Sequence, residues 1–115
     1  MKVFDTELER LDLLDPDMVE KIEDARDKVL ECVKTASESQ KQSESIRIQC
    51  DAVAGFINEL WGEGTAQKIF KGKTNLLTHM KALGEILDGI EAAANAQYSE
   101  LERITSKYSP VRILK

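Results

Sequence analysis

Residues 15–62 read DPDMVEKIEDARDKVLECVKTASESQKQSESIRIQCDAVAGFINELWG, and the spacing of their apolar residues predicts the fold. One stripe advances in alternating steps of four and three residues, and eleven of its thirteen members are apolar or Cys: Met18, Ile22, Ala25, Val29, Cys32, Ala36, Ser39, Ser43, Ile46, Cys50, Val53, Ile57 and Leu60. This heptad pattern is typical of a helix that packs along another helix. Asp15 suits the cap of a helix and Pro16 its first residue. We therefore predict one long helix over residues 16–61.

A second apolar stripe follows a glycine-rich segment. Residues 62–74 hold three glycines, which permit the positive φ angles of a sharp turn. The stripe after them again advances in steps of four and three: Leu76, Met80, Leu83, Leu87, Ile90, Ala94, Gln97, Leu101, Ile104 and Tyr108. Pro110 ends it, because the residue before a proline disfavours helix. We predict a turn over residues 62–74, a second helix over 75–108 and a tail over 109–115.

The two predicted helices fit together in antiparallel register about the turn. Their stripe residues then face each other in order: Leu60 with Leu76, Ile57 with Met80, Val53 with Leu83, Cys50 with Leu87 and Ile46 with Ile90. Farther from the turn, Ser39 would face Gln97 in a polar layer that fixes the register. The expected fold is all-α: a long, antiparallel, coiled-coil-like helical hairpin.

Two further features extend this hairpin. Thr6-Glu7-Leu8-Glu9 resembles a capping box and predicts a short helix over residues 6–14. Several apolar residues lie off the stripes and give each helix a wider apolar face than a two-helix contact can bury: Leu30, Val33, Phe56, Leu77 and Ile86. We expect self-association of the chain into an oligomeric helical bundle.

Length and charge bound the possible functions. The 115 residues suit a single domain over 1–115, and the formal charge of -5 argues against nucleic-acid binding. Residues 1–62 hold 8 basic and 15 acidic residues, whereas residues 63–115 hold 8 and 6. No apolar run approaches the roughly 20 residues of a membrane span. The start of the sequence meets charge at once, so we expect a cytoplasmic protein, or one exported without a cleaved signal.

Few residues suggest chemistry. Cys32 and Cys50 would lie about 27 Å apart on one continuous helix, too far for a disulfide. With a single histidine, His79, they do not form a zinc site of the usual spacing. No pair of carboxylates stands out as a general acid and base. We expect no metal, no cofactor and no enzyme activity, with Cys32 and Cys50 as buried thiols and His79 partly exposed.

The segment Gly72-Lys73-Thr74 is similar to the end of a phosphate-binding loop. The match fails, because Gln67 stands where that loop requires glycine and no strand is expected before it. A helix boundary capped by Thr74 or Asn75 is the preferred interpretation.

A block around the glycines resembles a known protein family. It reads Glu59-Leu60-Trp61-Gly62-Glu63-Gly64-Thr65-Ala66-Gln67-Lys68-Ile69-Phe70, followed by Gly72-Lys73-Thr74-Asn75-Leu76. Similar blocks occur in small helical proteins of phages and prophages of Gram-positive bacteria, with Phe expected where this chain has Trp61. These proteins resemble tail assembly chaperones. The resemblance implies a non-enzymatic protein of a bacterial host that binds a phage tail protein before the tail polymerises.

The same block supplies the candidate partner-binding residues, which are Trp61, Gly62, Gly64, Ile69 and Phe70. Large apolar side chains at a bend either cap the end of a bundle or bind a partner, and Trp is enriched among residues that dominate binding energy. Packing is the favoured role for Trp61 on its own.

Two alternatives stay open. A small secreted helical hairpin of the Trp-X-Gly type has a similar size and a Trp at its bend, but here Gly62 follows Trp61 directly. A cytosolic coiled-coil adaptor of unknown partner would show the same helical pattern.

Overall fold

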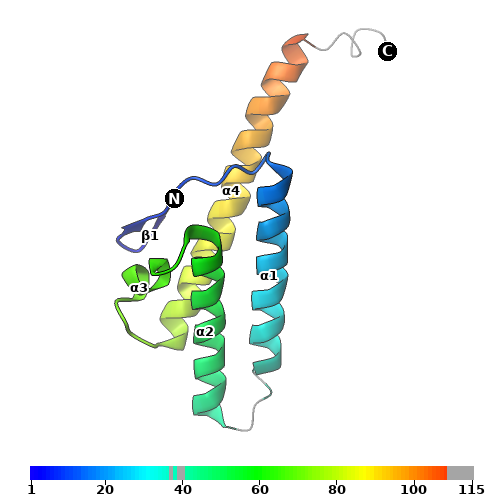
Figure 1. Ribbon diagram of the computed structural model, residues 1–115. Helices are drawn as coiled ribbons and strands as arrows, with labels where there is room; N and C mark the ends of the chain where they lie inside the picture. Colours follow the sequence, from blue (N-terminus) through cyan, green and yellow to red (C-terminus); the bar gives the residue numbers. More distant parts are fainter. Residues whose placement is uncertain (37, 39–40, 109–115) are drawn as a thin grey trace.

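The computed structural model describes residues 1–36, 38 and 41–108, and within them the fold is helical. Four helices, α1 (Pro16–Ala36), α2 (Gln42–Trp61), α3 (Thr65–Phe70) and α4 (Leu76–Tyr108), account for most of the chain. Strands β1 (Lys2–Val3) and β2 (Thr6–Glu7) form a small antiparallel hairpin in which Lys2 pairs with Glu7. Figure 1 shows α1, α2 and α4 packed side by side. The predicted all-α class is confirmed.

The prediction of one helix over residues 16–61 is wrong, because the chain forms two helices there. α1 ends at Ala36, α2 begins at Gln42, and the two lie antiparallel (Figure 1). Residues 37–45 contain no apolar side chain. A straight helix through this segment would therefore have no apolar face to bury there. Chain reversal lets the apolar face around Val29 pack against that around Val53. The predicted layer at Ser39 lies outside the described residues.

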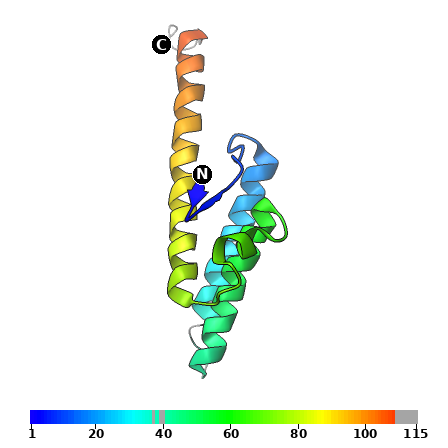
Figure 2. The ribbon, with the colours of Figure 1, turned by 90° about the vertical axis from the view of Figure 1, so that its left-hand side faces the viewer.

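The antiparallel pairing predicted for α2 and α4 is also wrong. Figures 1 and 2 show α4 running in the same direction as α2 and opposite to α1. The connection over residues 62–75 is a crossover that returns along the bundle, because α3 buries Ala66, Ile69 and Phe70 in the common core. An antiparallel helical hairpin is present, but α1 and α2 form it.

The predicted short helix over residues 6–14 is wrong as well. Residues 8–15, here called the strap, cross the end of the bundle without helical structure. The strap buries Leu8, Leu11 and Leu13 and leaves Leu14 42% exposed. One helical face would hold Leu8, Leu11 and Leu14 and would turn Leu13 outward, so an extended path buries these leucines better.

The helix ends follow local sequence signals. Asp15 Oδ1 accepts a hydrogen bond from the Asp17 backbone N–H at 2.9 Å, which confirms the predicted start of α1. Asn75 Oδ1 accepts a bond from the Thr78 N–H at 3.0 Å and caps α4, as expected at this boundary. α4 begins and ends within one residue of the second predicted helix.

One contiguous core joins all of these elements. Its most buried side chains include Val53 and Ile57 of α2, Ile86 of α4 and Val3 of β1. Ile22 and Ala25 of α1 belong to the same core cluster as the strap leucines Leu8, Leu11 and Leu13. The core therefore depends on contacts between segments far apart in sequence.

We expect Ile57→Ala to lower the free energy of unfolding by about 2 to 5 kcal/mol, because it leaves a cavity among fully buried side chains. Leu77→Ala is the matched control, since Leu77 is 64% exposed on α4. Urea denaturation followed by circular dichroism measures both. Equal losses in the two variants would contradict this placement of the core.

Candidate protein-interaction site

The glycine turn between α2 and α3 is built by backbone geometry. Gly62 has a φ of 107° and Gly64 a φ of 88°, values that side chains with a Cβ rarely adopt. The Asn58 side chain accepts a hydrogen bond from the Ala66 N–H at 2.9 Å and caps α3. These glycines therefore permit the sharp entry into α3, which is a structural role.

Three apolar residues of the predicted partner-binding set lie against the core. Ile69 and Phe70 are 5% and 6% exposed. Trp61 is half-buried, and its Nε1–H donates a hydrogen bond to the Glu9 carbonyl at 2.9 Å. Their burial gives all three a packing role in this conformation, while partner binding by them stays a prediction.

Phe70 packs against His79, a contact that the sequence did not indicate. The two rings stack with centroids 3.7 Å apart and planes within 11°. His79 is 4% exposed, so the expectation of a partly exposed histidine is wrong. Its Nδ1–H donates to the Asn75 carbonyl at 2.8 Å, since a carbonyl can only accept. This arrangement fixes α3 onto the first turns of α4.

The two cysteines lie on different helices, because the predicted continuous helix is broken. Both are free thiols; Cys50 is buried and Cys32 half-buried. Burial raises the pKa of the Cys50 thiol, and the neighbouring Asp51 carboxylate adds to the rise. The thiol therefore stays protonated near neutral pH.

Among the described residues, no cluster of three or more His, Cys, Asp or Glu side chains is arranged to hold a metal ion. None of the helices described is long and apolar enough to cross a membrane.

The surface that stands out is the free end of α4. Figure 2 shows this end extending well beyond the other helices. Residues 98–108, here called the arm, are all exposed. Along one side of the arm, Leu101, Ile104 and Tyr108 are 41%, 50% and 69% exposed, and Tyr98 lies beside them at 57%. The arm thus continues the predicted stripe of the second helix past the point where other segments cover it.

Gln97 marks the boundary between the covered part of α4 and the arm. Its side-chain oxygen accepts a hydrogen bond from the Leu13 N–H at 2.8 Å, and its amide donates to the Leu11 carbonyl at 3.0 Å. Gln97 is 8% exposed, so both bonds are shielded from water. The sequence placed Gln97 in a polar layer, but its partner is the strap and not another helix.

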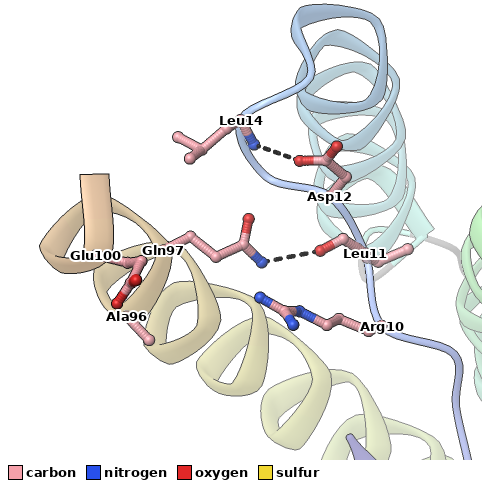
Figure 3. A pocket seen from close by; sticks show the side chains of 7 residues that line it. All are labelled: Arg10, Leu11, Asp12, Leu14, Ala96, Gln97 and Glu100. Atoms are coloured by element: carbon pink, nitrogen blue, oxygen red, sulfur yellow. Dashed lines mark hydrogen bonds between the residues drawn. The ribbon is translucent and has the colours of Figure 1, made fainter. Parts of the chain in front are cut away.

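A hollow of about 680 Å³ lies between the strap and α4 beside Gln97. Figure 3 shows the Arg10 and Leu14 side chains extending from the strap on either side of the Gln97 amide. The lining residues are Arg10, Leu11, Asp12 and Leu14 of the strap and Ala96, Gln97 and Glu100 of α4. Apolar and charged groups of both signs therefore meet at the base of the arm.

Comparison with known proteins gives a family without a known activity. The model of a family of unknown function (DUF6673) matches residues 5–114, nearly the whole chain. No curated protein matches the chain, and no solved structure matches it.

We expect Gln97→Met to lower the free energy of unfolding by about 1 to 3 kcal/mol, because it leaves the Leu11 carbonyl and the Leu13 N–H buried without their partner. Hydrogen exchange at the Leu13 amide should accelerate. Gln67→Met, on the exposed side of α3, is the control. Unchanged exchange at Leu13 would show that Gln97 does not hold the strap.

Substitutions at Phe70 and Trp61 test their packing role. Phe70→Ala should cost about 3 to 5 kcal/mol of stability, because it removes a buried aromatic ring. Trp61→Phe should cost about 0.5 to 1.5 kcal/mol, because it loses the hydrogen bond to Glu9 but keeps most of the packing. Urea denaturation measures both losses. A Phe70→Ala variant as stable as the wild type would contradict the packing role.

Proposed function

We propose that this chain, which belongs to the DUF6673 family, is a non-enzymatic protein that binds other proteins through helix contacts. We further propose that it acts in the cytoplasm of a bacterial host, as a structural or chaperone-like component in the assembly of a phage or prophage tail. One observation carries the binding function, namely the exposed apolar stripe of the arm.

The arm has the pattern of a helix that docks onto another helix. Leu101, Ile104 and Tyr108 follow one another in steps of three and four residues, which places them on one face. Ser99 and Ser106 lie on the opposite face of the same turns. A helix with one apolar and one polar face is the form that partners recognise through anchors at this spacing. Large apolar side chains exposed side by side favour an interaction surface over a solvated helix end.

Support for the tail-assembly role comes from the sequence block at the glycine turn. Its resemblance to phage proteins suggests the class of partner, a tail protein before polymerisation. Burial of Ile69 and Phe70 leaves less apolar surface at this turn than at the arm. We therefore place recognition at the arm and give the turn a supporting role in the fold.

The alternatives gain no particular support from the geometry. A secreted hairpin of the Trp-X-Gly type has its Trp at the bend, whereas here the hairpin of α1 and α2 bends between Ala36 and Gln42, far in sequence from Trp61. A cytosolic adaptor would use the same arm but bind a protein unrelated to tails. The identity of the partner separates the adaptor from the tail-assembly proposal.

Co-expression with tail proteins from phages of Gram-positive bacteria tests this function. We expect the chain to co-purify with one of them and to raise its soluble fraction. Leu101→Asp with Ile104→Asp, the arm variant, should lose this effect because two charges replace the apolar anchors. Ser99→Asp with Ser106→Asp, the control variant, adds the same charge on the opposite face and should keep it.

Two results would overturn parts of the proposal. If no tail protein binds the wild-type chain, the tail-assembly role is wrong. If the arm variant binds as well as the control variant, the binding surface lies elsewhere.

A further inference from the structure

We infer that two copies of this chain join through their arms, as an antiparallel pair in which the Tyr108 of each copy seats in the hollow beside Gln97 of the other. This inference goes beyond the proposed function and does not depend on it; both use the apolar stripe of the arm, so a tail protein and the second copy would compete for it. The purified chain alone tests it, so its failure can be distinguished from failure of the tail-assembly role.

The apolar stripe of the arm matches itself when two arms run in opposite directions. With Leu101 of one copy opposite Ile104 of the other, the symmetry of the pair repeats this contact. The same register brings Tyr108 of each copy level with Gln97 of the other. In heptad terms, each a position of one arm then packs against a d position of the other, as in antiparallel coiled coils.

Charges beside the stripe are complementary in this register. Glu100 and Lys107 flank the stripe on the same side of the arm, seven residues apart. In the antiparallel pair, Glu100 of each copy lies beside Lys107 of the other, so two pairs of opposite charge form. Glu100 already contacts Arg103 of its own helix and would lie between two cations. A parallel pair would instead place Glu100 beside Thr105 and form no such contact.

The hollow at the base of the arm lies where Tyr108 of the second copy arrives. Its lining includes Glu100 and Gln97 on α4 and Leu14 on the strap, which is 42% exposed. Arg10 offers a cation for the aromatic ring, and Asp12 offers an acceptor for the hydroxyl group. The Lys107 Nζ lies 5.3 Å from the centroid of the Tyr108 ring in its own chain. The two side chains are therefore close together, so that in the dimer Lys107 would lie near Glu100 of the other copy when Tyr108 enters the hollow of that copy.

The shape of the molecule also favours the antiparallel arrangement. The bundle lies at the base of each arm, and only the arm extends beyond it (Figure 2). Opposed arms place the two bundles at opposite ends of the contact, whereas parallel arms would set them against each other.

The size of the contact predicts its strength. Eleven residues of helix span about 16 Å. A pair of such arms, with one aromatic side chain seated at each end, lies at the low end of specific protein interfaces. We therefore expect a dimer that forms at micromolar concentration and dissociates on dilution.

Sedimentation equilibrium of the purified chain over a range of concentrations tests the dimer. We expect a monomer–dimer equilibrium for the wild type and for the control variant Ser99→Asp with Ser106→Asp. The arm variant Leu101→Asp with Ile104→Asp should stay monomeric at every concentration. At concentrations low enough for all three to be monomeric, circular dichroism should show the same helical content and melting, because none of these residues is buried.

Charge exchange tests the register. Lys107→Glu alone and Glu100→Lys alone should each weaken association by roughly tenfold, because attraction turns into repulsion at both symmetric contacts. The double variant, with both substitutions, should recover most of the lost affinity. Tyr108→Ala should weaken association as well, through loss of the ring from the hollow.

Several outcomes would overturn the inference. A wild-type monomer at all concentrations excludes the dimer and assigns the stripe to another occupant. An arm variant that dimerises like the control variant places the contact elsewhere. A double charge variant no better than the single ones excludes the antiparallel register.

Discussion

The arrangement of this protein depends on nine consecutive residues, 37–45, that offer no apolar side chain. Helix packing stabilises the fold only where apolar faces meet, because burial of such surface is the main favourable term in folding. Over these nine positions a straight helix would gain nothing from packing. The chain instead ends α1 at Ala36 and begins α2 at Gln42, so that the two apolar faces cover each other. Every later element then packs against this pair.

The crossover that follows determines the direction of α4. A tight turn at Gly62 would have sent the next helix back down the face of α2. Burial of α3 requires a longer path, and the stacking of Phe70 on His79 ties that path to the beginning of α4. α4 consequently runs alongside α2 in the same direction and passes the end of the bundle.

In this protein the sequence pattern predicts local structure better than it predicts how the helices are arranged in space. The helices and their apolar faces are readable from the stripes, because the period of a helix and the burial of its face are local properties. Whether two stripes pair in the same or in opposite directions is not readable, because both directions present the same residues to a neighbour. The reversal of direction between α1 and α2 left a weak signal in the sequence, the absence of apolar residues over 37–45, which the lack of glycine and proline concealed. The candidate site moved for a similar reason: from the sequence, Ile69 and Phe70 could either cap the bundle or bind a partner, and only the crossover shows them as core.

Gln97 gives the arm a fixed direction as well as a boundary. A single side chain holds the strap at both Leu11 and Leu13, so α4 is clamped at this level and free beyond it. The arm is therefore held at one end only, and a small bend of the helix near Gln97 displaces Tyr108 more than it displaces the residues next to Gln97. A partner bound near Tyr108 would therefore act on the hydrogen bonds by which Gln97 holds the strap.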